Sequence, residues 1–295
     1  MKKHTIALGL LPLFLTACDV PLQSEYSQEY VVESYLVALE PMPALHLSRT
    51  APAGTAYIFE ELAVSDAAVE LQLLSPDGST ESSIPYREQE KGIYQPVSSQ
   101  TLVLPRRTYA LNISFENDAT IIKSQTVVPD TFSFTNETAD SIIYQSEDRL
   151  KLDITSSFSP DRQNIFLFSF EAKDVSFDQL TPFIKDIFDE ETDSLDEFRI
   201  NESPIINENN YDRNPNGTLT IKIPWLAIVF YGETDIIINA LDDNFFDFVR
   251  SQEIQTNGRT LSPGEITNVI DNIEGGAGIF ASMARQKTTV FINRE

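Results

Sequence analysis

Histidine and cysteine most often carry nucleophilic or metal chemistry, and this 295-residue chain holds two histidines and one cysteine. His4 lies in the N-terminal leader described below, so a Ser-His-Asp triad would have to use His46. No G-x-S-x-G nucleophile elbow accompanies it, and one imidazole cannot build a histidine-rich metal site. We therefore expect His46 to be an exposed strand residue, and we expect no catalytic residue, cofactor or metal.

Carboxylates are concentrated between residues 174 and 197, and such a run could supply several of the about six to eight oxygens that Ca²⁺ takes. The spacing does not match an EF-hand loop, and no glycine provides its sharp turn. A solvated acidic surface is the simpler interpretation, and calcium binding stays open. A glycosidase-type pair of carboxylates also stays open, because the chain has 45 acidic residues. Their spacing does not single out any two of them. The acidic residues of this run are Asp174, Asp178, Asp186, Asp189, Glu190, Glu191, Asp193, Asp196 and Glu197.

Glycines cluster near the C-terminus, where Gly275, Gly276 and Gly278 precede Phe280. Glycine permits backbone conformations closed to other residues and close approach of a ligand or a strand. A phosphate-binding P-loop would need a Lys-Ser/Thr pair after the glycines, and none follows. We assign these four residues to ligand or partner contact. A sharp structural turn before the last strand is the alternative.

The N-terminal leader is the most specific signal in the chain. Two lysines precede an apolar run over residues 6–15, which is too short to cross a bilayer as a helix. Residues 1–17 are therefore predicted to be a signal peptide. The run ends in Leu-Thr-Ala-Cys, which resembles the lipobox of bacterial lipoproteins. We predict lipidation of Cys18 and an acylated tether over residues 18–29; an ordinary signal peptide with a chance cysteine is the alternative.

The charge balance is strongly acidic, with a net charge of −24. Nucleic acid is excluded as an expected partner, because phosphate binding requires a basic face. Loss of the two leader lysines would bring the mature charge to −26, which disfavours contact with anionic lipid headgroups. We therefore expect the acyl chains to hold the protein at the membrane.

Alternating apolar and polar residues dominate the first half of the chain. Residues 69–73 and 109–115 alternate in this way, and the Ser-Pro-Asp-Gly sequence at 75–78 predicts a turn. Short strands at this spacing, without a helical period between them, favour a β-sandwich. We predict an N-terminal β-sandwich over residues 30–130.

The second half, residues 131–295, is also rich in predicted strands. Residues 150–154 alternate, and 165–170 form a nearly continuous apolar run typical of a central strand. Helical spacing occurs near residues 182–191 and 244–251. The fold class expected is therefore mainly β, with two β-sandwich-like domains of which the second carries short helical insertions.

Several segments together resemble a known family. They are IEGGAGIF at 273–280, YVVESYL at 30–36, LSRTAP at 47–52, VSDAAV at 64–69 and GIY at 92–94. The combination is similar to the Bacteroidota-type outer-membrane lipoproteins catalogued as domain of unknown function 4249. The resemblance implies an immunoglobulin- or transthyretin-like first domain and association with a TonB-dependent transporter. It carries over no catalytic residues, and residues 174–215 match no family segment.

The expected function is therefore that of an acyl-anchored outer-membrane lipoprotein. It would be a non-catalytic binding or accessory subunit of a TonB-dependent outer-membrane barrel, capturing a nutrient and handing it over. We expect it to face the cell surface, and a periplasm-facing position stays open. A structural or adhesive surface module is the first alternative, and a carboxylate-based hydrolase is the second. The ligand, the oligomeric state and the role of residues 174–215 cannot be read from the sequence.

Overall fold

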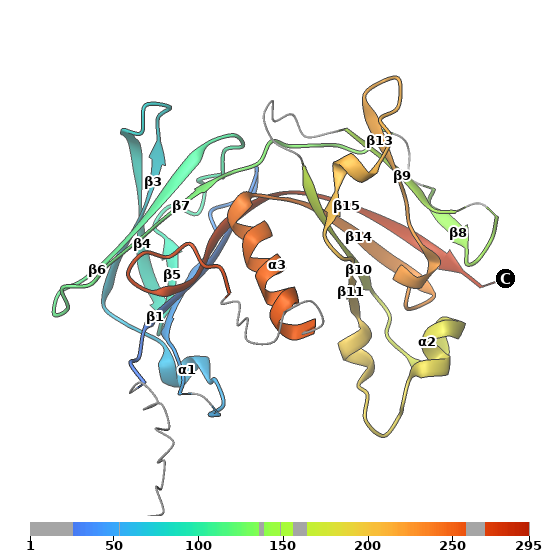
Figure 1. Cartoon of the computed structure of the whole chain (residues 1–295), viewed down its shortest axis with the longest axis horizontal. Helices are drawn as coiled ribbons and strands as arrows, with labels where there is room; N and C mark the ends of the chain where they lie inside the picture. The colour runs from blue at the N-terminus through green and yellow to red at the C-terminus, as the bar shows by residue number, and fades with distance from the viewer. Residues whose placement is uncertain are drawn as a thin grey trace, which may run out of the picture.

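Strands make up 46% of the fold and helices 14%, which confirms the prediction of a mainly β protein. The computed structural model describes residues 26–52, 54–135, 139–147, 149–155, 164–257 and 269–294. Cys18 and the predicted signal peptide lie outside these residues. Figure 1 shows two β-rich halves joined by long strands, with helix α3 beneath the junction. None of the described helices is long and apolar enough to cross a membrane.

The N-terminal half is a curled sheet in which strand alternation matches burial. Its strands follow the order β1-β2-β5-β4-β3-β6-β7. An isolated bridge between Lys123 and Glu274 brings β7 back toward the start of β15, so the sheet curls round one core. The elements are β1 (Tyr30–Val37), β2 (Leu45–Arg49), α1 (Phe59–Leu62), β3 (Ala67–Leu74), β4 (Thr80–Glu90), β5 (Ile93–Pro96), β6 (Thr108–Phe115) and β7 (Ile121–Val127).

The last strand, β15 (Ala277–Asn293), belongs to both halves. Residues 277–283 pair in parallel with β1, and residues 283–292 pair antiparallel with β14 (Gly232–Leu241). A single 13-stranded sheet therefore runs through the molecule, and β15 is the long strand that crosses Figure 1. The first part of this strand completes the N-terminal sheet, although it lies near the end of the chain.

The C-terminal half has two facing layers. The large sheet contributes the order β11-β10-β14-β15, and β9 and β13 form a separate two-stranded sheet. Apolar side chains of both layers belong to one core cluster that also extends through the N-terminal half. The remaining elements are β8 (Ser141–Ile143), β9 (Lys151–Thr155), β10 (Ile165–Ala172), η1 (Phe177–Gln179), α2 (Pro182–Ile187), η2 (Leu195–Phe198), β11 (Ile200–Glu202), β12 (Ile206–Asn207), η3 (Glu208–Asn210), β13 (Thr218–Lys222), η4 (Trp225–Ala227) and α3 (Asp243–Asn257).

The predicted helices form, with differences in their surroundings. Pro182 opens α2 as expected for a first-turn proline. The Thr181 hydroxyl does not cap α2, however; it donates to the backbone oxygen of Ile228 at 3.0 Å. Of the apolar residues of α2, Ile184 is buried whereas Phe183 and Ile187 are about half exposed. This helix therefore presents apolar side chains to the surface.

Candidate functional site

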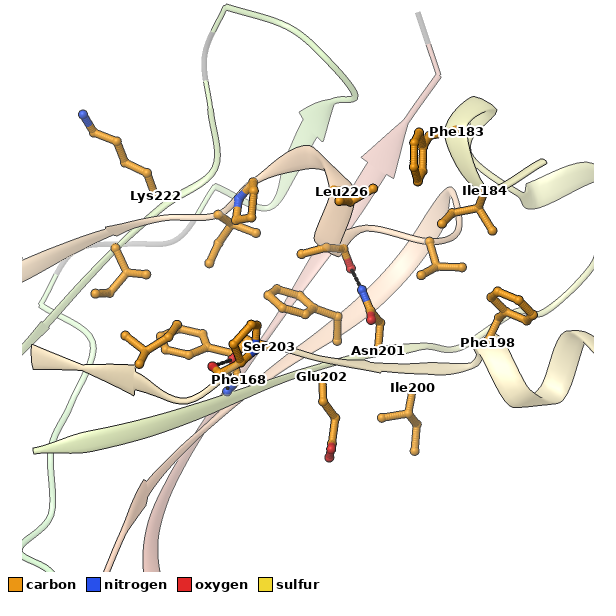
Figure 2. A pocket seen from close by; sticks show the side chains of 18 of the residues that line it. Phe168, Phe183, Ile184, Phe198, Ile200, Asn201, Glu202, Ser203, Lys222 and Leu226 are labelled. Carbon is orange, nitrogen blue, oxygen red and sulfur yellow. Dashed lines mark hydrogen bonds between the residues drawn. The ribbon is translucent and has the colours of Figure 1, made fainter. Parts of the chain in front are cut away.

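An apolar pocket of about 530 Å³ opens between the two layers of the C-terminal half. We call it the β10–β13 pocket. Figure 2 shows its lining converging from β10, β11, α2 and η4, with β13 alongside. The lining consists of Phe168, Phe170, Phe183, Ile184, Glu197, Phe198, residues 200–204, Ile206, Tyr211, residues 221–224, Leu226, Ala227 and Val229. Many of these residues fall within the 174–215 segment that matched no family motif.

The inner walls of the pocket are hydrocarbon. Phe168 and Phe170 lie in β10, Ile221 lies in β13, and Ile223 directly follows β13. All four side chains are at most 4% exposed. The β10 run is continuously apolar because its two faces meet two different clusters. Phe168 and Phe170 belong to the main core, and Leu167 packs with Met283 on the other side. A strand buried on both faces is thus the floor of the site.

The mouth of the pocket is apolar as well. Phe183 is 49% exposed, Ile200 is 52% exposed and Leu226 is 55% exposed. A buried threonine holds α2 in place beside this opening, since the Thr181 backbone donates to Val229 at 2.9 Å. Exposed apolar side chains gathered around a cavity are typical of a ligand or partner site.

Polar groups of the lining are engaged with the protein or lie at its edge. The Asn201 side chain donates to the Ala227 oxygen at 2.9 Å, which ties β11 to η4. The Ser203 hydroxyl donates to Pro204 at 2.8 Å and accepts the Phe168 amide at 3.0 Å. Figure 2 shows Glu202 directed away from the apolar side chains. The pocket therefore offers an apolar surface rather than a set of convergent acids or bases.

The glycine segment meets neighbouring strands. A Cβ on Gly275 would lie 2.5 Å from the backbone oxygen of Ile121, and one on Gly276 would lie 2.7 Å from that of Tyr30. Gly278 has a φ of +107°, and a Cβ there would lie 2.1 Å from the Val32 oxygen. Close approach of β1 and β7 thus explains why glycine occupies these positions.

Phe280 lies in the core with no exposed surface, so its ring packs against the protein. Its backbone is fixed by Asn272, whose side chain donates to the Phe280 oxygen at 2.7 Å and accepts the Phe280 amide at 3.1 Å. The Asn272 side-chain nitrogen also donates to the Ser124 hydroxyl at 2.8 Å. The four residues assigned to ligand or partner contact are therefore placed at the junction of β15 with β1 and β7, away from the β10–β13 pocket.

Of the other residues considered for chemistry, Glu197 lies at the rim of the pocket, and His46 and the remaining acidic residues of the 174–197 run do not line it. His46 is exposed on β2, beside the Phe59 ring at 5.5 Å. In the acidic stretch, Asp193 accepts the Asp189 amide at 3.0 Å and Asp189 accepts the Glu191 amide at 3.0 Å. These carboxylates therefore accept hydrogen bonds from the backbone of their own loop. Among the described residues, no three His, Cys, Asp or Glu side chains are grouped as a metal site.

Comparison with solved structures gives only distant matches. The trypsin-activated alpha-2-macroglobulin from Escherichia coli aligns with 90% of this chain and 16% of its own, at 10% identity and a TM-score of 0.23. Three N-terminal domains of the bacteriophage RB49 highly immunogenic outer capsid protein align with 91% of this chain and 71% of theirs, at 8% identity and a TM-score of 0.24. This chain thus spans a small part of the alpha-2-macroglobulin. No curated protein matches it.

The family comparison covers nearly the whole chain. A family model matches residues 16–289, a range that includes the glycine segment and every residue of the β10–β13 pocket. This match confirms the resemblance seen in the sequence motifs. The chain belongs to the family described as Domain of unknown function (DUF4249).

Proposed function

We propose that this protein is an acyl-anchored binding lipoprotein of the outer membrane that captures a small apolar ligand without chemical turnover. It hands the ligand to a TonB-dependent transporter, of which it is an accessory subunit. The β10–β13 pocket is the observation that supports the binding role. Its walls are buried and apolar, its mouth is open, and its volume of about 530 Å³ is in the range of small-molecule sites.

The lipobox supports the anchoring part of the proposal. Acylation of Cys18 would place the lipid eight residues before Tyr26, a span that reaches at most about 28 Å. The Tyr26 hydroxyl bonds Thr50 just after β2, so the chain enters the folded body at the N-terminal half. The anchored end and the β10–β13 pocket thus lie in different halves of the same sheet. We place the body at the cell surface, where it could cover an outer-membrane barrel.

Copurification tests the accessory role. The full-length protein, with an affinity tag at its C-terminus, is isolated from gently solubilised native membranes. We expect a β-barrel protein to copurify in near-stoichiometric amount, because an accessory subunit needs a stable interface larger than about 1,000 Å². Elution of the protein alone across several mild detergents, together with unchanged nutrient uptake after its deletion, would reject this role.

Two variants separate anchoring from capture. Cys18→Ser should abolish acylation and, with it, membrane retention. Leu226→Asp places a charge at the pocket mouth and should reduce ligand uptake while leaving barrel association intact. Ile187→Asp is the matched control, since Ile187 is 58% exposed on the neighbouring helix α2 but does not line the pocket.

A further inference from the structure

We infer that the β10–β13 pocket holds a single extended hydrocarbon chain of a neutral lipid or amphiphile. This inference rests on the proposed capture function and specifies its ligand class. It depends on three features of the described residues: the length of the pocket, the apolar character of its walls, and the position of its charged residues.

The pocket is elongated along β10. Ile206 pairs with Phe166 and Ile200 pairs with Glu171, so these two lining residues are separated by five residues along β10. At about 3.3 Å per residue the separation is about 17 Å. An extended hydrocarbon chain can lie along this direction and contact the lining from Ile200 to Ile206.

Figure 2 shows how the lining is spread out. Lys222 lies on one side of it, Phe183, Ile184 and Phe198 lie on the other, and Phe168 and Ser203 lie between them. Most of the lining is hydrocarbon, so an apolar chain meets apolar side chains along much of its length. A hydrocarbon chain gains from every part of such a surface, since the favourable free energy scales with the apolar area removed from water.

Two polar side chains of the lining are already hydrogen-bonded to the protein. The Asn201 amide bonds Ala227 and the Ser203 hydroxyl bonds Pro204. Hydroxyl groups of a sugar placed in the pocket would face phenylalanine and isoleucine side chains and lose their hydrogen bonds to water without replacement. The hydrocarbon character of the walls therefore selects against carbohydrates.

The charged residues of the lining are Glu197, Glu202 and Lys222, and all three are exposed. A neutral chain leaves each of them in water, whereas an anionic head group would approach two carboxylates on a protein of net charge −24. The charged residues therefore disfavour an anionic head group, and a neutral chain is the ligand that we propose.

Binding of straight-chain alcohols tests the inference directly. The protein used begins at residue 19; every paired strand and all three apolar clusters lie between residues 26 and 294, so the fold is retained. Trp225, the single tryptophan, lies in η4 beside Leu226 and reports binding by its fluorescence. Calorimetry of the same titrations gives a readout independent of the fluorophore. The ligands are octanol, decanol, dodecanol and tetradecanol.

We expect the affinity to rise about fourfold for each added methylene and to level off once the chain fills the pocket. Leu226→Asp should weaken dodecanol binding at least about tenfold, whereas Ile187→Asp should bind as the wild type does. An affinity independent of chain length, or equal binding by Leu226→Asp, would overturn the inference. The barrel copurification is a separate measurement, so loss of the ligand class and loss of the accessory role are distinguishable.

The source of the chain is tested with phosphatidylcholine vesicles that carry a pyrene-labelled acyl chain. A fall in pyrene excimer fluorescence with the wild type, absent with Leu226→Asp, identifies a membrane lipid as the ligand. Alcohol binding without extraction identifies a free amphiphile. Either result supports a hydrocarbon chain in the pocket, and failure of both assays rejects it.

Discussion

Gly278→Ala should destabilise the fold far more than Gly232→Ala, although both glycines have a positive φ. Gly232 opens β14 with a φ of +97°, and a Cβ there would meet nothing within 4 Å. Gly278 lies in β15 with a φ of +107°, opposite Val32 of β1. A Cβ on Gly278 would lie 2.1 Å from the Val32 oxygen and 2.9 Å from the Val32 nitrogen. The pair therefore separates backbone strain from steric overlap.

The magnitudes follow from these two terms. A side chain at a positive φ costs about 1–3 kcal/mol, and the entropy removed from the unfolded chain offsets about 0.4–1 kcal/mol of that in both variants. At Gly278, carbon and oxygen must also separate by about 1.2 Å to reach an ordinary contact of about 3.3 Å. This shift breaks the nearest hydrogen bonds between β1 and β15, at about 1 kcal/mol each, and leaves buried groups unpaired at about 1–3 kcal/mol each.

Urea unfolding followed by circular dichroism measures both variants. We expect Gly232→Ala to lose about 1–2 kcal/mol of unfolding free energy and Gly278→Ala to lose at least about 2–3 kcal/mol more. Failure of Gly278→Ala to fold at all would agree with the same reasoning. Equal losses within about 0.5 kcal/mol would show that β15 does not approach β1 as closely as the structure places it.

Three further results are expected. Burial acts to raise the pKa of Asp235, but hydrogen bonds from Lys173, Lys287 and Thr289 hold that pKa at about 2, below the ordinary value. A depressed carboxyl pKa stabilises the fold above pH 4, and this stabilisation is lost as the pH falls toward 2. In urea unfolding, the free energy of unfolding of the wild type should therefore exceed that of Asp235→Asn by less at pH 2 than at pH 4. We expect this difference to shrink by about 1–2 kcal/mol, a value reduced because the partner lysines are partly exposed. The pKa of Asp118 is held at about 2, first by a hydrogen bond from the Thr120 hydroxyl and then by one from the Tyr30 hydroxyl. Tyr30→Phe removes the second of these bonds, and carboxyl NMR titration should show the pKa of Asp118 rising toward its ordinary value. Cys18→Ser should leave an uncleaved precursor that incorporates no labelled fatty acid, and unchanged labelling would contradict the lipobox assignment.

Local patterns predicted the elements that have local causes. The alternation at residues 109–115 became β6, and the apolar run at 165–170 became β10, buried on both faces. The helix predicted near 244–251 is part of α3, which continues to Asn257. Phe245 and Phe246 of this helix pack on a small cluster that joins β1, β10 and β15. Side-chain period and helix signals are short-range properties, so the sequence displays them openly.

Long-range pairing left no such mark. Val31 pairs with Ala277 across almost the entire chain, and nothing near either residue indicates a parallel partner. The three glycines did indicate a close approach of the backbone to another group. From the sequence alone, that group could equally be a strand or a ligand. The structure shows the approach to be that of β1 and β7. The glycines thus marked a real constraint whose partner only the fold identifies.

The β10–β13 pocket was hidden from the sequence for a related reason. Phe183, Ile200 and Leu226 are residue types that usually lie in a core. Each is about half exposed, because its surroundings are formed by elements from distant parts of the chain. The available signal was a set of apolar residues within the acidic stretch at 174–197, for which a solvated surface was the simpler interpretation. Apolar residues retained in such surroundings indicate a surface that is covered in use.

The shared strand β15 connects the pocket to the half of the protein where the described chain begins. Its first part pairs with β1 beside the chain entry, and its second part pairs with β14, which in turn pairs with the pocket floor β10. Backbone hydrogen bonds therefore link the N-terminal half to the pocket through one continuous sheet. Under the proposed function this arrangement would fix the position of the pocket relative to the end of the body that carries the lipid anchor. Shape changes within this sheet would have to break paired strands, so under the proposed function we expect ligand entry and release at the apolar mouth that Phe183 and Leu226 line.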